Sequence, residues 1–315
     1  MAAMTISIRR ALLLAFGAIV VFITIVLLSL SLIQRDRLVR DLAPKILGRA
    51  QMHADAELRL LFGSISQRLI VHHRQIEMGL LQRYDTPRLK NAFLPYAYNM
   101  HAVGSMMVGD TSGYQLLVMR YDSLVTRSPL MAGRTDLPGP SREAPQYFTR
   151  EFRASVWGER SVWTLWEPSG VRVQQSWEQV LPGYDPRKRE WLLRALARRN
   201  EFESTGNLED RESLVAWTDV YTLFTSKTPG ISASIAAREP SGDVVVVAYD
   251  LLLDDLSAFV RLQHPTPDGR VFIISDSGLV VGLPESEELR TELERQEALL
   301  KPLEEIGDPE LAAWM

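Results

Sequence analysis

The chain has 315 residues, enough for about two domains, and its net charge of −4 gives no sign of the basic face that nucleic-acid-binding proteins usually carry, so we expect no nucleic-acid partner. Its hydrophobic content of 46% is ordinary for a globular protein. Cysteine is absent, which excludes disulfides, thiolate metal sites and cysteine nucleophiles.

The first feature in chain order is an uncharged apolar segment, residues 11–33, which reads ALLLAFGAIVVFITIVLLSLSLI. A helix of this length spans roughly 30 Å, the thickness of a bilayer core. A cleaved signal peptide has an apolar region of only about 7–15 residues, so the segment predicts a retained transmembrane helix. Residues 1–10 are then a short cytoplasmic tail. Arginines flank the segment on both sides, so charge alone does not fix its orientation.

A long stalk helix is predicted within residues 34–85, because apolar residues recur there at helical spacing on one face. A helix of roughly 70 Å is longer than one domain core needs, so we expect it to leave the membrane and to serve as a spine or dimer contact. The alternative is two shorter helices broken at Pro44. His53, His72 and His73 are interpreted as surface histidines rather than as metal ligands.

The main domain begins after a turn at residues 84–87, where Asp85 or Thr86 can cap a helix that runs to Tyr98, with Pro87 in its first turn. Residues 126–146 are rich in proline and glycine and are expected to form a loop. β-Branched and aromatic runs bounded by turn residues predict strands. These runs cover residues 102–108, 114–121, 161–167, 171–180, 214–225, 230–237 and 243–250, with residues 153–160 as a strand or turn.

Short turns between sequential strands favour antiparallel pairing, so the predicted fold class is α+β. A short helix is expected over residues 190–199. A second, smaller unit is predicted after residue 250. Its expected elements are a helix over 251–262, a hairpin of 270–275 with 279–283, and a helix over 285–306.

The segment Gly183–Trp191 concentrates an aromatic residue, a turn, three cations and an indole donor in the sequence GYDPRKREW. Arginine can hold a carboxylate with paired, charge-assisted hydrogen bonds, and the indole N–H adds a donor. The segment is therefore suited to hold a small anionic or zwitterionic ligand at the rim of a pocket. The alternative is a surface turn at Asp185 and Pro186, with Arg187 and Arg189 paired to acids.

Three local signatures accompany each other in the main domain. The first is YDPRKREW at residues 184–191, and the second is WTDVY at residues 217–221 with PGISAS at 229–234. The third is VVVVAYDLLL at residues 244–253, followed by GRVFIIS at 269–275. Together they resemble the extracytoplasmic double-Cache sensor family, whose first motif is Tyr-Asp-Pro-Arg-x-Arg-x-Trp-Tyr.

The resemblance covers about residues 34–284 and implies two stacked PAS-like modules behind the long helix. The membrane-distal module, residues 86–250, is expected to bind a ligand, and the membrane-proximal module, residues 251–315, is expected to be incomplete. The family implies a sensor of the inner membrane with its main domain in the periplasm, and a homodimer through the stalk helix. Such receptors continue into a second transmembrane helix and an output domain, such as a nucleotide cyclase, diguanylate cyclase, histidine kinase or chemotaxis module. We therefore expect the chain to be a piece of a longer protein.

The ligand site implied by the resemblance is that of an amino acid or a related amine. It comprises the residues Tyr184, Arg187, Arg189, Trp191, Tyr221 and Asp250. Arg189 and Trp191 would hold a carboxylate, and Asp250 would accept from an ammonium group with help from a tyrosine hydroxyl. Leu192 stands where the family has a second tyrosine, so another small organic anion is the alternative ligand.

Other functions are also open at this stage. Asp250 has a simpler interpretation as the N-cap of a helix that begins at Leu251. No Gly-x-Ser-x-Gly, His-Glu-x-x-His or Walker loop is present, so we do not expect this chain to be an enzyme, and we predict no cofactor or metal. The remaining alternative is an anchored interaction domain that takes no small ligand.

Overall fold

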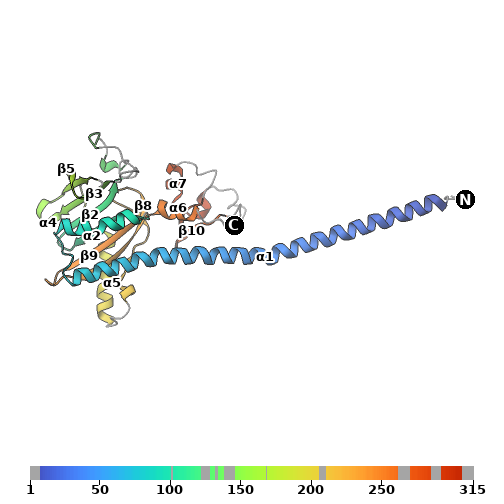
Figure 1. Ribbon diagram of the computed structural model, residues 1–315, viewed down its shortest axis with the longest axis horizontal. Coiled ribbons are helices and arrows are strands. Elements are labelled where there is room, and N and C mark those ends of the chain that lie inside the picture. The colour runs from blue at the N-terminus through green and yellow to red at the C-terminus, as the bar shows by residue number, and fades with distance from the viewer. Residues whose placement is uncertain are drawn as a thin grey trace. The chain divides into compact units, whose positions relative to one another are not determined.

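The computed structural model describes residues 8–100, 102–121, 128–131, 134–137, 146–167, 169–205, 211–261, 270–284 and 292–306. The chain divides into two units, Met1–Ala56 and Glu57–Met315, and each is described by itself. Figure 1 shows the chain with part of its helices and strands labelled.

Helix α1 runs without interruption from Ile8 to Glu77 (Figure 1). Because it continues through Pro44, the alternative of two helices broken there is wrong. It ends at Glu77, short of the predicted end of the stalk. In the described part of the chain, no helix is long and apolar enough to cross a membrane. Several side chains of the predicted span 11–33 lie outside that part, and the span stays a prediction.

The second unit contains a nine-stranded sheet in the order β5-β4-β3-β2-β1-β9-β8-β6, with β7 also paired to β8. Every pairing in it is antiparallel, as the short turns predict. Its strands are β1 Val103–Asp110, β2 Tyr114–Tyr121, β3 Gln146–Arg153, β4 Arg160–Trp166, β5 Val173–Val180, β6 Ala216–Trp217, β7 Tyr221–Thr222, β8 Pro229–Arg238 and β9 Val244–Leu252.

Helices and a small second sheet complete an α+β fold, which confirms the predicted class. The other α-helices are α2 Thr86–Asn99, α4 Ala154–Trp157, α5 Glu190–Thr205, α6 Leu253–Arg261 and α7 Glu292–Ala298. The 3-10 helices are η1 Pro129–Met131, η2 Pro186–Lys188, η3 Arg211–Leu214 and η4 Leu303–Glu305. The second sheet pairs β10 Ile273–Ile274 with β11 Val280–Gly282.

Two predicted elements are shorter than expected. The strand predicted over 214–225 is two short strands, β6 and β7. Between them the Thr218 hydroxyl accepts the backbone N–H of Ser232 at 2.9 Å, so a side chain takes a bond that a continuous ladder would use. The helix predicted over 285–306 ends in its described part at Ala298, because Leu300 adopts a left-handed φ of 69°.

Two boundaries near the predicted site also differ. Strand β9 continues to Leu252, so α6 begins at Leu253 and not at Leu251. The predicted division between modules at residue 250 therefore falls inside a strand. Strand β3 was not predicted. Most of its residues lie between the predicted loop 126–146 and the predicted element 153–160, and they were assigned to no element.

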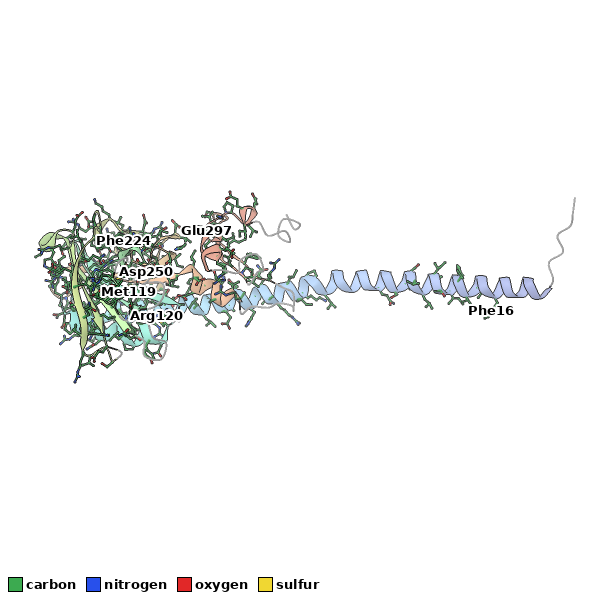
Figure 2. All side chains as sticks on the ribbon, turned by 90° about the horizontal axis from the view of Figure 1, so that it is seen from above. Phe16, Met119, Arg120, Phe224, Asp250 and Glu297 are labelled. Carbon is green, nitrogen blue, oxygen red and sulfur yellow. The ribbon has the colours of Figure 1, made fainter. Side chains whose placement is uncertain are left out.

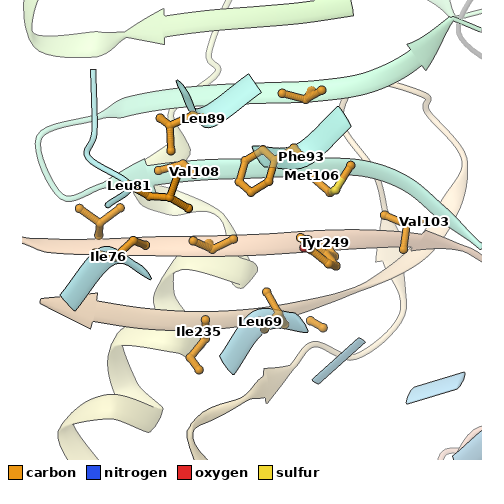
Figure 3. Close-up of a cluster of buried hydrophobic side chains, with 14 of the residues drawn as sticks. Leu69, Ile76, Leu81, Leu89, Phe93, Val103, Met106, Val108, Ile235 and Tyr249 are labelled. Carbon is orange, nitrogen blue, oxygen red and sulfur yellow. The ribbon is translucent and has the colours of Figure 1, made fainter. Parts of the chain in front are cut away.

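The two faces of the large sheet carry different side chains, because residues alternate along each strand. One face, which we call the helix face, packs its apolar residues against α1 and α2 (Figure 3). Leu69 of α1 and Phe93 of α2 are fully buried there beside Tyr249 of β9. The opposite face, which we call the cavity face, packs against α5 through Trp191 and Leu192.

The polar groups of the helix face include two histidines that the sequence placed wrongly on the surface. His72 is 1% exposed and His73 is 6% exposed, whereas His53 is exposed. The Nε2 atom of His72 lies 2.7 Å from the Tyr249 hydroxyl, and its Nδ1 lies 3.0 Å from Oε1 of Gln75. Burial lowers the pKa of His72 to about 4, so this histidine is neutral at physiological pH.

Candidate functional site

A small cavity lies on the cavity face of the sheet, beside the start of α5. It is small: as the side chains stand, about 20 Å³ is open to the centres of water-sized spheres, which is room for about one water molecule. All of the predicted site residues except Arg187 line it, namely Tyr184, Arg189, Trp191, Tyr221 and Asp250. The fold therefore brings residues from β7, β9 and the η2–α5 segment to one small space.

The η2–α5 segment is held by its own turn chemistry. Gly183 adopts a φ of +69°, and the Asp185 carboxylate then accepts the backbone N–H of Arg187 at 3.0 Å as the cap of η2. Trp191, at the start of α5, lies over Gly109 of β1. A Cβ at Gly109 would come within 2.7 Å of the indole ring, so only glycine leaves room for the tryptophan that walls the cavity.

Two residues of the motif do not line the cavity. Arg187 is exposed, and its guanidinium binds the Asp185 carboxylate through two bonds of 2.9 Å. This corresponds to the simpler interpretation of Arg187 as part of a surface turn. Leu192 is 1% exposed and packs in the hydrophobic core with Ala195. The position where the family has a second tyrosine is thus a core position here.

Asp250 forms the acidic end of the cavity and is buried among the side chains of the second unit (Figure 2). Its Oδ2 accepts from the Ser105 hydroxyl at 2.7 Å, and its Oδ1 accepts from the Ser232 hydroxyl at 2.5 Å. The Tyr221 hydroxyl lies 2.6 Å from the same Ser232 oxygen. Because Asp250 lies inside β9, it does not cap the following helix, and that interpretation is wrong.

Burial raises the pKa of Asp250 to about 6, although the hydrogen bonds from Ser232 and Ser105 lower it in part. Burial also raises the pKa of Tyr221, with a further contribution from the charge of Asp250. Among the described residues, no cation forms an ion pair with Asp250. The carboxyl group is therefore buried with hydroxyl donors, and the positive charges of Arg189 and Arg150 lower its pKa in part without forming an ion pair with it.

Arg150 of β3 forms the opposite, basic end and was not predicted. It is 1% exposed. Its Nη1 donates to the Thr225 hydroxyl at 3.0 Å, and its Nη2 donates to Oε1 of Gln115 at 2.8 Å and to the Tyr184 hydroxyl at 3.1 Å. Burial lowers the pKa of Arg150. Within the described part of the chain, no carboxylate pairs with this guanidinium.

Two further cations lie near the mouth. The Arg189 guanidinium lies over the rings of Tyr221 and Phe224, at 5.6 and 5.9 Å from their centroids. The Lys227 ammonium lies 4.0 Å from the Phe224 centroid. Burial first, and then the charges of Arg189 and Arg150, lower the pKa of Lys227. The positive charges of these side chains therefore repel one another, and the basic end of the cavity carries an excess of positive charge.

A sequence signal for Arg150 exists, although it is not a motif. In the run YFTREFR, residues 147–153, alternation places Arg150 on the same strand face as Phe148 and Phe152. A charged residue between two aromatic residues of one face is expected to be buried with a special role. This alternation can be recognised only after residues 147–152 have been assigned to a strand.

This arrangement suits the binding of a small polar molecule rather than covalent chemistry. Tyr184, Arg189 and Trp191 come from one segment of the chain. Asp250 comes from a distant segment and has the opposite charge to Arg189. In the part of the chain that is described, no cluster of histidine and acidic side chains could hold a metal ion.

Comparison with solved structures finds ligand-binding domains of bacterial chemoreceptors. That of the amino acid chemoreceptor PctC of Pseudomonas aeruginosa, in complex with GABA, has 16% identity and a TM-score of 0.45, covering 83% of this chain and 80% of its own. That of Pseudomonas fluorescens CtaA with L-isoleucine has 15% identity and a TM-score of 0.46, covering 86% and 76%. That of Pseudomonas aeruginosa PctB with L-Arg has 14% identity and a TM-score of 0.42, covering 82% and 68%. No family model matches the chain, and no curated protein matches it.

Proposed function

We propose that this chain is the ligand-sensing part of a transmembrane signalling receptor, and that its cavity binds an amino acid or a related small organic anion. The observation that carries the proposal is the charge arrangement of the cavity. A buried carboxyl group, Asp250, and two arginines, Arg150 and Arg189, line one small space without forming an ion pair with each other. The sequence resemblance to double-Cache sensors supports the same conclusion.

The energetics favour a ligand over a purely structural role. A buried charge without a countercharge is costly, by several kcal/mol per ion in real proteins, unless something compensates it. An amino acid carries an ammonium and a carboxylate on one carbon. Its ammonium would meet Asp250, with Tyr221 close by, and its carboxylate would meet Arg189 and the Trp191 indole. Binding would then give each end of the cavity the direct ion pair that it does not form within the described part of the chain.

We also propose the membrane setting that the sequence suggests. Residues 11–33 would anchor the chain in the inner membrane, the main domain would lie in the periplasm, and two copies would pair through the stalk helix. The support is the uncharged 11–33 segment and the length of α1. In this scheme ligand binding favours one arrangement of residues 86–250 and shifts the helices below it. An output domain such as a nucleotide or diguanylate cyclase would lie beyond residue 315.

Isothermal titration of the full chain in mild detergent tests the ligand part of the proposal. The titrants are the twenty amino acids and a set of small carboxylates, each at pH 7.5. We expect saturable heat with at least one titrant, and a loss of about tenfold or more in affinity for Asp250→Asn and Arg189→Gln, because each removes a charge-assisted bond of about 1.5–3 kcal/mol. Arg187→Gln is the matched control and should bind like the wild type. Absence of binding to every titrant would leave the interaction-domain alternative in place.

A further inference from the structure

Among the described residues, Arg150 is the one charged residue that lines the cavity and does not belong to the family motif. It comes from β3, whereas the motif residues come from the η2–α5 segment, β7 and β9. It is nearly completely buried, at 1% exposure, and it forms no ion pair with a carboxylate among the described residues, although the charge of Asp250 acts on it. A buried arginine without an ion pair is expected either to be stabilised by aromatic rings or to bind an anion from a ligand.

The hydrogen bonds of Arg150 leave donors free. A guanidinium has five N–H donors in a planar fork. Three bonds are made, to the neutral oxygens of Thr225, Gln115 and Tyr184. The Nε atom is buried and has no partner. A buried donor without a partner costs about 1–3 kcal/mol, so an acceptor that arrives with a ligand would remove a real penalty.

The charges at the cavity are unequal in a way that a simple amino acid does not balance. Arg150 and Arg189 line the cavity, Lys227 lies beside the lining residue Phe224, and among the described residues Asp250 is the one acid in the lining. An amino acid with a neutral side chain brings one positive and one negative charge, so it leaves the excess unchanged. A ligand with a second carboxylate reduces the excess by one.

The sheet register sets the spacing between Arg150 and Asp250. Arg150 pairs with Leu117 of β2, Leu117 pairs with Met107 of β1, and Met107 pairs with Ala248 of β9, two residues before Asp250. Three strand spacings of about 4.8 Å separate the backbones of Arg150 and Asp250 by about 14 Å across the sheet. Both side chains lie on the cavity face, with Leu117 and Met107 between them. A ligand that bridges the two charged groups would have to displace these intervening side chains.

We infer that Arg150 is an additional ligand-binding residue that receives a second carboxylate, and that the ligand class is the acidic amino acids. This assignment rests on the proposed function, since it places the ammonium at Asp250 and the first carboxylate at Arg189. The second carboxylate would accept from the free Nε–H of Arg150 and remain near the hydroxyls of Tyr184 and Thr225. Arg150 thereby sets the specificity of the site.

The competing explanation is that Arg150 is a structural cation held by aromatic rings. Its guanidinium lies 4.8 Å from the Tyr184 centroid, 5.4 Å from that of Trp163 and 5.7 Å from that of Phe224. Such contacts stabilise a desolvated cation by about 2 kcal/mol or more. If Arg150 is only a structural cation, an acidic amino acid and its amide should bind with equal affinity. If Arg150 binds a second carboxylate, the acid should bind much more tightly than the amide.

The experiment compares ligands on the unchanged protein, so it does not depend on a variant that folds. The full chain in mild detergent is titrated with L-glutamate, L-aspartate, L-glutamine and L-asparagine at pH 7.5. We expect at least one acid to bind about tenfold or more tightly than its amide, the value of one charge-assisted bond. Equal binding of acid and amide overturns the assignment of Arg150 while the proposed function stands. No binding of any of the four overturns the assignment of Arg150, and the wider set of amino acids and carboxylates then decides the proposed function.

Variants then assign the preference to the residue. In Arg150→Met the ratio of acid to amide affinity should fall to about one, and in Arg150→Lys, which keeps the charge and loses the fork, it should lie between. Arg153→Met is the matched control, because Arg153 is on the same strand but pairs with Glu151 and does not line the cavity. An unchanged ratio in folded Arg150→Met contradicts the assignment.

Discussion

The two faces of the large sheet differ in how they treat buried polar groups. On the helix face, His72 and Tyr249 bind each other, and Gln75 takes the remaining ring nitrogen. On the cavity face, Asp250 and Arg150 hydrogen-bond to neutral partners and influence each other's pKa without forming an ion pair. The buried pair of the helix face is neutral, whereas the buried groups of the cavity face are charged. This difference is the reason for proposing that the cavity face binds the ligand.

The faces are joined through one strand. Tyr249 and Asp250 are neighbours on β9, and alternation sends their side chains to opposite sides of the sheet. Tyr249 contacts α1 through His72, whereas Asp250 lines the cavity. A displacement of β9 on ligand binding would therefore reach the long helix directly. The predictions that follow separate the two faces, from the largest expected effect to the smallest.

The largest effect is expected from Phe93→Ala on the helix face. Phe93 is fully buried between α2 and the sheet, so its removal leaves a cavity and should lower the free energy of unfolding by about 3–5 kcal/mol. The folded protein should keep its ligand affinity. Tyr98→Ala, on the exposed side of the same helix, should change stability by less than about 0.5 kcal/mol in urea titrations. A loss of affinity in the folded Phe93→Ala protein would mean that the faces are not independent.

Acidification should affect the faces in opposite directions. The raised pKa of Asp250, about 6, means that the folded state holds a proton that the unfolded chain has released, so this group stabilises folding below about pH 4 and loses that contribution as pH rises through 6. The lowered pKa of His72, about 4, has the opposite sign: its contribution is present above pH 6.5 and is lost as pH falls through 4. Each is worth about 3 kcal/mol at 1.36 kcal/mol per pK unit.

Single variants reveal that opposition. Relative to wild type, Asp250→Asn should lose more stability between pH 6.5 and pH 4, because only the His72 contribution remains, and His72→Gln should lose less. The measurement is the free energy of unfolding in urea at several pH values. Comparing each variant with wild type cancels the titration of all other groups. Parallel curves for wild type and Asp250→Asn would show that Asp250 has an ordinary pKa.

At neutral pH, Asp250→Asn should separate function from stability. Burial outweighs the hydrogen bonds and the nearby arginine charges and raises the pKa of Asp250 to about 6, so removal of its charge is expected to leave the fold as stable or more stable. Affinity for an amino acid should fall about tenfold or more, because the ammonium loses its charged acceptor. Ser105→Ala, which removes one donor to the same carboxyl group, should have a smaller effect on affinity. A destabilised Asp250→Asn protein with unchanged affinity would assign Asp250 a structural role.

A modest effect is expected from Tyr249→Phe. The change removes the hydroxyl that lies 2.7 Å from Nε2 of His72 and leaves that nitrogen unpaired, at a cost of about 1–3 kcal/mol in unfolding free energy. The smallest effect is expected from Arg187→Gln, an exposed change that should alter neither stability by more than about 0.5 kcal/mol nor affinity.

The fold and the site were predictable to different extents, for physical reasons. Hairpins such as β1–β2 could be predicted because the residues that form the turn, Gly109 to Gly113, are neighbours in the sequence. The break between β6 and β7 depends on the Thr218 hydroxyl, a tertiary contact that no local pattern contains. Motif residues such as Arg189 were predicted because they lie close together in the chain. Arg150 was missed because only the sheet register brings β3 to the cavity.

The most direct test of the account is proton release on ligand binding. Titrations with L-glutamine, whose side chain does not titrate, are made at pH 6 in two buffers of different ionisation heat. Asp250 is about half protonated at this pH, so an ammonium group beside it should favour the charged form and release about half a proton per bound ligand. The release should vanish in Asp250→Asn. A heat of binding that is the same in both buffers for the wild type would contradict the claim that the ligand ammonium meets Asp250.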